Sequence, residues 1–335
     1  MADYRADKDV LTQFAHAALK EWDLDVASVT FHSQSENTVF RVVATDGEAF
    51  ALRVHRDGYH DLPALESEHE WTSALAAAGL FVPQCVLTRG GQAYATLALP
   101  NSDQTRHVGL VKWISGATLA RHLGKNPGAS EVSFVYEGLG RVIADFHLAT
   151  AQWTPTPDFK RHAWNADGLV GDAPFWGCFW EVDAASVDER AELLAIRTQL
   201  RDILSALPLD ASVYGMIHAD FNANNVLRDG DKLSVIDFDD AGFGWHAFDL
   251  AVAVWERMDA LTGQAQFVMA HDALVKGYRG RRGDCHSVTK HVPMFLLIRS
   301  LMLLRWMQDR PEAGYTAMIP MLLKLALRQA RELCL

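Results

Sequence analysis

Cysteine is scarce in this sequence, and the few residues present are scattered. Four cysteines occur among 335 residues, and none forms a C-x-x-C pair. This spacing argues against both a zinc site and a disulfide framework. The first residues, MADYRADKD, contain no apolar run of the kind found in a secretory signal peptide. We therefore expect a cytoplasmic protein in a reducing compartment.

Basic residues are outnumbered by acidic ones, and long apolar runs are missing. The chain has 31 Lys and Arg against 42 Asp and Glu, for a net charge of −11. This balance argues against a nucleic-acid partner and mildly favours a cationic or metal-bound one. The most apolar stretch, Val292 to Leu304, is interrupted by Arg299 and is too short to cross a bilayer. We expect a buried helix there, and no membrane partner.

The first third of the chain carries the pattern of a small antiparallel sheet. Short apolar stretches are separated by turns such as Asp46-Gly47, and one helical stretch falls between the third and fourth. The expected strands are 29–31, 39–43, 50–54, 93–99 and 108–113, with the helix at 63–78. The order is β-β-β-α-β-β. The loop from Ser33 to Asn37 contains no glycine, so by itself it is not a glycine-rich phosphate cradle.

The rest of the chain is mostly helical in pattern. An amphipathic helix is expected over residues 131–153, with Phe134 among the residues of its apolar face. A second helix is expected at 186–207, with Ser186 or Asp188 as its N-cap. The segment from Ala173 to Trp180 is strongly aromatic. Such clusters usually belong to the core, although aromatic faces also attract cations by about 0.5 to 2 kcal/mol.

The stretch from Met216 to Asp240 carries the chemistry. It begins with the polar run HADFNANN and continues into two short apolar strands separated by an Asp-Gly turn, which predicts a hairpin. Asn225 enters the first strand and Asp237 leaves the second. Because they lie symmetrically about residue 231, we expect their Cα atoms to be roughly 4.5 to 5.5 Å apart. Asp220 lies on the loop before them.

Two carboxylates and an amide oxygen in one small volume suit a hard divalent cation. Mg²⁺ prefers oxygen ligands, commonly one or two carboxylates together with phosphate oxygens and water. An Asp followed by an Asn five residues later, with a further Asp after a strand, is the phosphotransfer arrangement. In it, the first Asp accepts the hydroxyl proton while the other two residues hold the metal. The competing interpretation is an Asp- and Asn-rich turn before a hairpin.

HADFNANN followed by VIDFDD resembles the catalytic core of the aminoglycoside phosphotransferase and choline kinase superfamily. The resemblance implies an α+β, bilobal protein-kinase-like fold with an antiparallel amino-terminal lobe and a mostly helical carboxy-terminal lobe. Residues 1–112 would form the nucleotide-binding lobe, and 113–335 the catalytic and substrate-binding lobe. Asp249 matches an Asp that braces the family's catalytic loop. Ala219 replaces a glycine that is usual in that loop.

The resemblance also implies roles for individual residues. Asp220 would be the catalytic base, and Asn225 and Asp237 would hold Mg²⁺. Arg53, in the strand position where kinases have a lysine, would bind the α- and β-phosphates of ATP. Its expected partner is Glu68, in the segment SEHEW. Glu70 in the same segment and Glu66 just before it are competing candidates.

Four further residues would complete the nucleotide site under the same resemblance. Ser35 and Asn37 lie in the loop over the phosphates. The Lys112 carbonyl and the Ile114 amide would contact the adenine ring, in the linker where the lobes are expected to meet. At the other end of the site, two carboxylates follow the metal-binding Asp. These are Asp239 and Asp240, which either meet a cationic substrate or face water.

The sequence thus predicts an ATP- and Mg²⁺-dependent O-phosphotransferase for a small, cationic acceptor. An amino alcohol, an aminoglycoside or a hydroxylated amino acid would fit. The alternatives are a protein Ser/Thr kinase of the same fold and a non-catalytic nucleotide-binding module. The intact Asp220, Asn225 and Asp237 argue against the module. A protein kinase is disfavoured because no A-P-E segment or long activation loop follows Asp237. Neither the acceptor's identity nor the oligomeric state follows from the sequence.

Overall fold

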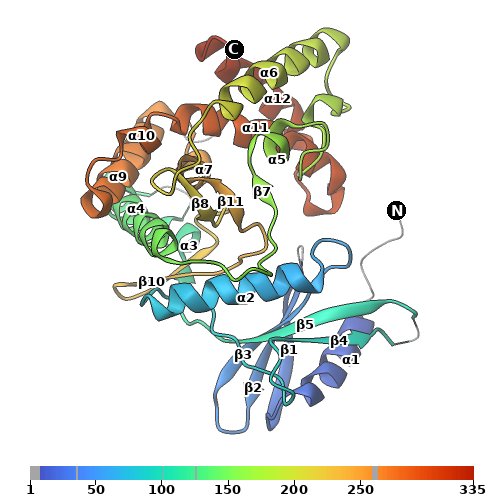
Figure 1. Ribbon diagram of the computed structural model, residues 1–335. Helices are drawn as coiled ribbons and strands as arrows, with labels where there is room; N and C mark the ends of the chain where they lie inside the picture. The colour runs from blue at the N-terminus through green and yellow to red at the C-terminus, as the bar shows by residue number, and fades with distance from the viewer. Residues whose placement is uncertain (1–7, 35–36, 101, 125–126, 259–262) are drawn as a thin grey trace. The chain divides into compact units, whose positions relative to one another are not determined.

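The computed structural model describes residues 8–34, 37–100, 102–124, 127–258 and 263–335. These residues form two compact units. The first contains the described residues of 1–116 together with 155–161 and 234–236, and the second contains the other described residues. Figure 1 shows the first unit in blue to teal, with its strands close to helix α2, and the second unit as mostly helices in green to red.

The first unit is built on a five-stranded antiparallel sheet of order β1-β2-β3-β5-β4. The predicted antiparallel amino-terminal sheet is therefore confirmed. In chain order its elements are α1 (Lys8–Ala18), η1 (Leu19–Glu21), β1 (Val26–Gln34), β2 (Thr38–Ala44), β3 (Ala49–Val54), α2 (Leu62–Ala77), β4 (Tyr94–Ala98) and β5 (Thr105–Lys112).

Alternate residues of the sheet and one face of α1 form the core of this unit. Phe14 and Trp22 pack with Phe40, Leu52 and Leu110, all nearly fully buried. Because successive side chains of a strand point to opposite faces, the residues between these core positions lie on the other face of the sheet. Arg53 is one of them, between the buried Leu52 and Val54.

The second unit is mostly helical, with two three-stranded sheets of order β10-β9-β6 and β7-β11-β8. Its strands are β6 (Ala117–Thr118), β7 (Ala163–Trp164), β8 (Tyr214–Ile217), β9 (Val226–Asp229), β10 (Lys232–Val235) and β11 (Gly242–Trp245), although the last two residues of β10 fall in the first unit. Its helices are α3 (Leu119–Leu123), α4 (Ala129–Gln152), α5 (Ala166–Val170), η2 (Phe179–Glu181), α6 (Val187–Ser205), α7 (His246–Trp255), α9 (Gln264–Arg282), α10 (His286–Thr289), α11 (Val292–Asp309), η3 (Pro311–Ala313), η4 (Thr316–Met318) and α12 (Ile319–Glu332).

The predicted buried helix around residue 299 is α11. Together with the residues just before it, this helix is long and apolar enough by composition alone to cross a membrane. However, 72% of that window is buried inside the structure, as in the core helix of a soluble protein. The prediction of a buried helix is confirmed, although the helical stretch is longer than the sequence indicated.

Candidate active site

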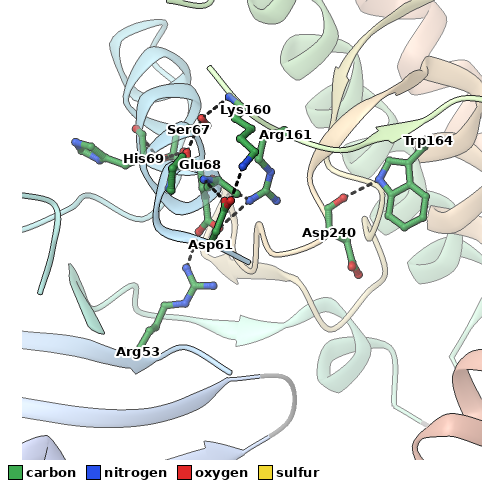
Figure 2. Close-up of polar contacts among 12 residues, drawn as sticks. Arg53, Asp61, Ser67, Glu68, His69, Lys160, Arg161, Trp164 and Asp240 are labelled. Carbon is green, nitrogen blue, oxygen red and sulfur yellow. Dashed lines mark hydrogen bonds and ion pairs between the residues drawn. The ribbon is translucent and has the colours of Figure 1, made fainter. Parts of the chain in front are cut away.

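Arg53 on β3 forms an ion pair with Glu68 on α2. Its Nη1 lies 2.7 Å from Glu68 Oε1, and the two side chains are only 14% and 4% exposed. Figure 2 shows Arg53 pointing from the strand toward the helix. The pair follows from the sheet's alternation, which turns Arg53 away from the α1 face, and from the buried face of α2, which includes Glu68.

The pairing with Glu68, which the sequence favoured, is confirmed, and the two competing glutamates have other environments. Glu66 is exposed, and Glu70 accepts hydrogen bonds from the backbone and hydroxyl of Thr156. A second cation that the sequence did not indicate also approaches Glu68. Arg161 Nη1 lies 3.7 Å from Glu68 Oε2 and donates to the carbonyl of Ala64.

Two guanidinium groups determine the ionisation of Glu68. Burial favours the neutral acid, but Arg53 and Arg161 outweigh burial and lower the pKa of Glu68 to about 2. The carboxylate therefore remains charged and fixes the orientation of Arg53. Glu68 thus holds the Arg53 guanidinium in one defined direction, and a guanidinium is a group that can bind phosphate oxygens through a planar fork.

We expect Glu68→Gln to lower the free energy of unfolding by about 3 kcal/mol at pH 7, because removing one partner leaves buried charge uncompensated. The folded pKa of about 2 lies below the ordinary 4.5. Ionised Glu68 therefore stabilises the fold above pH 4.5, and that stabilisation is lost as the pH falls toward 2. Urea unfolding should show the gap to wild type narrowing by about 2 kcal/mol between pH 5 and 3.

The matched control is Glu66→Gln on the same helix. Glu66 is exposed, so its replacement should change stability by no more than about 0.5 kcal/mol, with no such pH dependence. Equal effects of the two substitutions would contradict the assigned role of Glu68.

The remaining predicted nucleotide residues have the following positions. Ser35 lies outside the described residues. Asn37 is buried just before β2, and its Oδ1 accepts a 3.3 Å hydrogen bond from the Arg56 amide. Lys112 is the last residue of β5 and pairs with Glu48 at 2.9 Å. Ile114 follows in the loop after β5, where neighbouring Trp113 donates its amide to the Ala49 carbonyl. The nucleotide roles of these residues stay predictions.

Asp220 lies in the loop between β8 and β9 with both carboxylate oxygens hydrogen-bonded. Oδ2 accepts from the side-chain amides of Asn225 at 2.6 Å and Asn222 at 2.8 Å. Oδ1 accepts from Arg299 Nη2 at 2.6 Å. The Asp220 side chain is still 20% exposed. These three donors fix the direction of a carboxylate that a small molecule can approach.

Asp249 on α7 braces the loop that carries Asp220, as the resemblance implied. Asp249 is fully buried and accepts from the amides of Ala219 at 2.7 Å and His218 at 3.1 Å. His147 Nε2 lies 3.0 Å from the same carboxylate. Burial raises the pKa of Asp249 to about 7, although His218 and the two amide bonds act against burial. The loop is therefore attached to the core at two successive amides.

Two neighbours of Asp220 have structural roles. His218 is fully buried, packs against Phe221 and Phe238, and accepts the Asp220 amide on Nδ1 at 3.2 Å. The prediction that His218 packs and hydrogen-bonds the loop is confirmed. Ala219 has a φ of 61°, in the left-handed region that a glycine adopts without strain. The loop thus keeps a glycine-like conformation at a cost of about 1 to 2 kcal/mol.

Asn225 and Asp237 flank the predicted hairpin of β9 and β10. The turn is Gly230-Asp231, shorter than the sequence suggested, because both strands extend farther toward it. Asn225 donates hydrogen bonds from its Nδ2 to Asp220. These bonds do not involve its Oδ1, which is the atom that would bind a metal. Asp237 is exposed and has a φ of 65°.

This donor set fits a nucleotide-bound cation. Among the described residues, no group of three or more His, Cys, Asp or Glu could hold a metal on its own. One amide oxygen and one exposed carboxylate suit Mg²⁺, which commonly takes its other ligands from phosphate and water. The residues present are therefore compatible with a metal that arrives with the nucleotide.

The two carboxylates that follow Asp237 differ in environment. Asp239 is buried, which excludes the solvated alternative for its side chain. Asp240 is half-buried, and its carbonyl accepts the Trp164 indole N–H at 2.7 Å, as Figure 2 shows. The nearby aromatic segment belongs largely to the core, since Trp176 and Trp180 are over 90% buried.

An antiparallel sheet, a mostly helical second unit and a braced D-x4-N loop together define a kinase-like phosphotransferase. The chain belongs to the Phosphotransferase enzyme family, whose profile matches residues 28–283. The chain is a phosphotransferase that acts on a hydroxyl group of a small molecule.

Named relatives and solved structures agree with this assignment. Amicoumacin kinase of Bacillus subtilis is 23% identical over 289 residues, covering 82% of this chain and 78% of the relative. A homoserine kinase of Methylobacterium nodulans is 32% identical over 223 residues, covering 65% and 60%. The structure of a microcompartment-associated aminopropanol kinase superposes with a TM-score of 0.76 at 28% identity, covering 96% of this chain and 94% of that one.

Proposed function

We propose that this chain transfers the γ-phosphoryl group of ATP, with Mg²⁺, to the hydroxyl of a small cationic molecule. The proposed acceptor is an amino alcohol, an aminoglycoside or a hydroxylated amino acid. The main support is the geometry of Asp220, a partly exposed carboxylate fixed by Asn222, Asn225 and Arg299. A general base must be held in this way to meet the hydroxyl whose proton it takes.

Each residue has one task in this proposal. Asp220 orients the acceptor hydroxyl and takes its proton as the oxygen attacks phosphorus. Arg53, braced by Glu68, binds α- and β-phosphate oxygens, and Asn225 and Asp237 hold the metal. When bound, Mg²⁺ neutralises charge on the phosphates. The other nucleotide contacts are assigned to Ser35, Asn37, Lys112 and Ile114.

The acceptor side of the proposal depends on carboxylates. Asp239 and Asp240 lie two and three residues after Asp237 and are proposed to meet the acceptor's positive group. Residues 1–112 are proposed as the nucleotide-binding lobe and residues 113–335 as the catalytic lobe. All four cysteines are free thiols, in keeping with a proposed location in the reducing cytoplasm.

The direct test is ADP release from purified protein, ATP and Mg²⁺ with one candidate acceptor at a time. The panel contains amino alcohols, aminoglycosides, hydroxylated amino acids and a generic protein substrate. We expect turnover with at least one small amine-bearing acceptor and none with the protein. Turnover with the protein alone, or with neutral or anionic sugars alone, would overturn the proposed acceptor class.

A further inference from the structure

Helix α11 brings a buried guanidinium to the catalytic carboxylate. Arg299 lies in a largely apolar part of α11 and is only 7% exposed. Its Nη2 donates to Asp220 Oδ1 at 2.6 Å, and its guanidinium carbon lies 4.7 Å from the centre of the Trp176 ring. The arginine is therefore fixed both by its bond to Asp220 and by the indole face.

The other amino group of Arg299, Nη1, is buried and has no hydrogen-bond partner among the described residues. Leaving a buried donor unsatisfied costs about 1 to 3 kcal/mol, and more when the donor is charged. Native structures rarely retain such a group without a purpose, and an acceptor from outside the chain would satisfy it. The planar fork of a guanidinium matches carboxylate and phosphate oxygens alike. Since the nucleotide phosphates are assigned to Arg53 and to the metal, a carboxylate of the acceptor is left for Nη1.

A second carboxyl group lies near this arginine. Glu256 caps the C-terminus of α7 and interacts electrostatically with both Asp220 and Arg299. Burial raises the pKa of Glu256, and the negative charge of Asp220 raises it further. A positively charged group arriving beside Glu256 would offset both effects. The surroundings of Asp220 thus contain a buried guanidinium donor without an acceptor among the described residues and, at the end of α7, a partly buried carboxyl group.

We propose, building on the function proposed above, that the acceptor is a hydroxylated amino acid whose carboxylate binds Nη1 of Arg299. Its ammonium group is assigned to Glu256 together with Asp239 and Asp240, and its hydroxyl faces Asp220. The hydroxyl oxygen forms the new bond to the γ-phosphorus of ATP, and the bond from that phosphorus to the β,γ-bridging oxygen breaks. ADP leaves with that electron pair, and the hydroxyl proton passes to Asp220.

The aromatic segment supports a primary ammonium rather than a bulky quaternary one. Arg299 lies over one face of the Trp176 ring, and Arg197 lies over one face of the Trp180 ring, with its guanidinium carbon 4.3 Å from the ring centre. These two faces are thus occupied by the chain's own cations. Recognition of the acceptor's positive group is left to carboxylates, which suit a small, hydrogen-bonding ammonium.

The test uses acceptor pairs that differ by a single carboxylate. Homoserine is compared with aminopropanol, threonine with isopropanolamine and serine with ethanolamine, by kcat/KM with ATP and Mg²⁺. We expect the wild-type protein to prefer the amino acid in at least one pair by about 10- to 100-fold, the worth of a charge-assisted hydrogen bond. Arg299→Gln should reduce that preference to within about threefold, and Arg299→Lys should restore part of it.

Two controls separate binding from structure. Glu256→Gln should raise KM for both members of a pair by similar factors, because the ammonium group is common to them. Thermal unfolding of each variant shows whether it folds. A preference for the amino alcohols, or an equal loss for both members in Arg299→Gln, overturns this inference and leaves the proposed function standing. Turnover with an aminoglycoside but with none of these acceptors likewise overturns this inference and leaves the proposed function standing. The absence of turnover with any amine overturns both the inference and the proposed function.

Discussion

Replacing Asp220 by Asn is expected to reduce kcat by about 10²- to 10⁴-fold, the usual contribution of a positioned general base. The Asn amide cannot take the acceptor's proton. It also introduces an NH₂ group where Asn222 and Asn225 both donate. ATP affinity should remain within about threefold of wild type, because the nucleotide residues are unchanged. Steady-state turnover and nucleotide titration measure the two quantities separately.

Asp231→Asn is the matched control for this substitution. Asp231 is an exposed carboxylate in the β9–β10 turn, and its replacement should leave kcat unchanged. Wild-type turnover in folded Asp220→Asn protein would remove Asp220 from the base role. A loss of ATP affinity equal to the loss of kcat would indicate a disrupted site instead.

The strands were predictable wherever the side chains alternate regularly. β2 and β3 lie within one residue of their predicted bounds because their buried positions recur at every second residue. β1 runs from Val26 to Gln34, far beyond the predicted 29–31. Register irregularities near Val26–Ser28 and Phe31–Ser33 interrupt its alternation. A bulge shifts later side chains to the other face, so a pattern with period two detects only the regular part.

Helix α4 shows the corresponding limit for helical patterns. Phe134 was assigned to its apolar face, and this prediction is wrong because the side chain is 53% exposed. Its ring instead lies 4.8 Å from the guanidinium carbon of Arg228. Periodicity identifies a stripe of the helix, but a residue at the edge of that stripe is buried only if another element reaches it.

In the candidate site, contacts between residues close in the sequence were predictable, and contacts between distant residues were not. Asp220 and Asn225 are only five residues apart in the sequence, which was sufficient to predict that they lie together. Asn225 Nδ2 is 2.6 Å from Asp220 Oδ2. Arg299 is 79 residues from Asp220, and no local spacing connects them. The one available signal was a single arginine within an apolar run, since a buried charge almost always has a partner. Arg161, which approaches Glu68, does not lie within an apolar run, so the sequence carried no such signal for it.

Asp237→Asn is expected to reduce Mg²⁺-dependent turnover by at least about 100-fold, since a bound metal contributes several kcal/mol to phosphoryl transfer. Asn suits this test because it tolerates the positive φ of Asp237, whereas Ala would add backbone strain. Asp237→Ala should lose at least as much activity with its fold retained. The half-saturating Mg²⁺ concentration should rise in both variants, because the exposed carboxylate supplies the charge that attracts the cation.

The same Mg²⁺ titration distinguishes a metal ligand from a structural residue. A lost ligand shifts the Mg²⁺ dependence and weakens Mg²⁺-dependent nucleotide binding, whereas nucleotide binding measured with EDTA stays as in wild type. Asp229→Asn, an exposed carboxylate at the end of β9, is the control and should shift neither. If Asp237→Ala keeps full activity with an unchanged Mg²⁺ requirement, the metal is held elsewhere. Asn225, whose amide nitrogen is committed to Asp220, would then lose its proposed role as the second ligand as well.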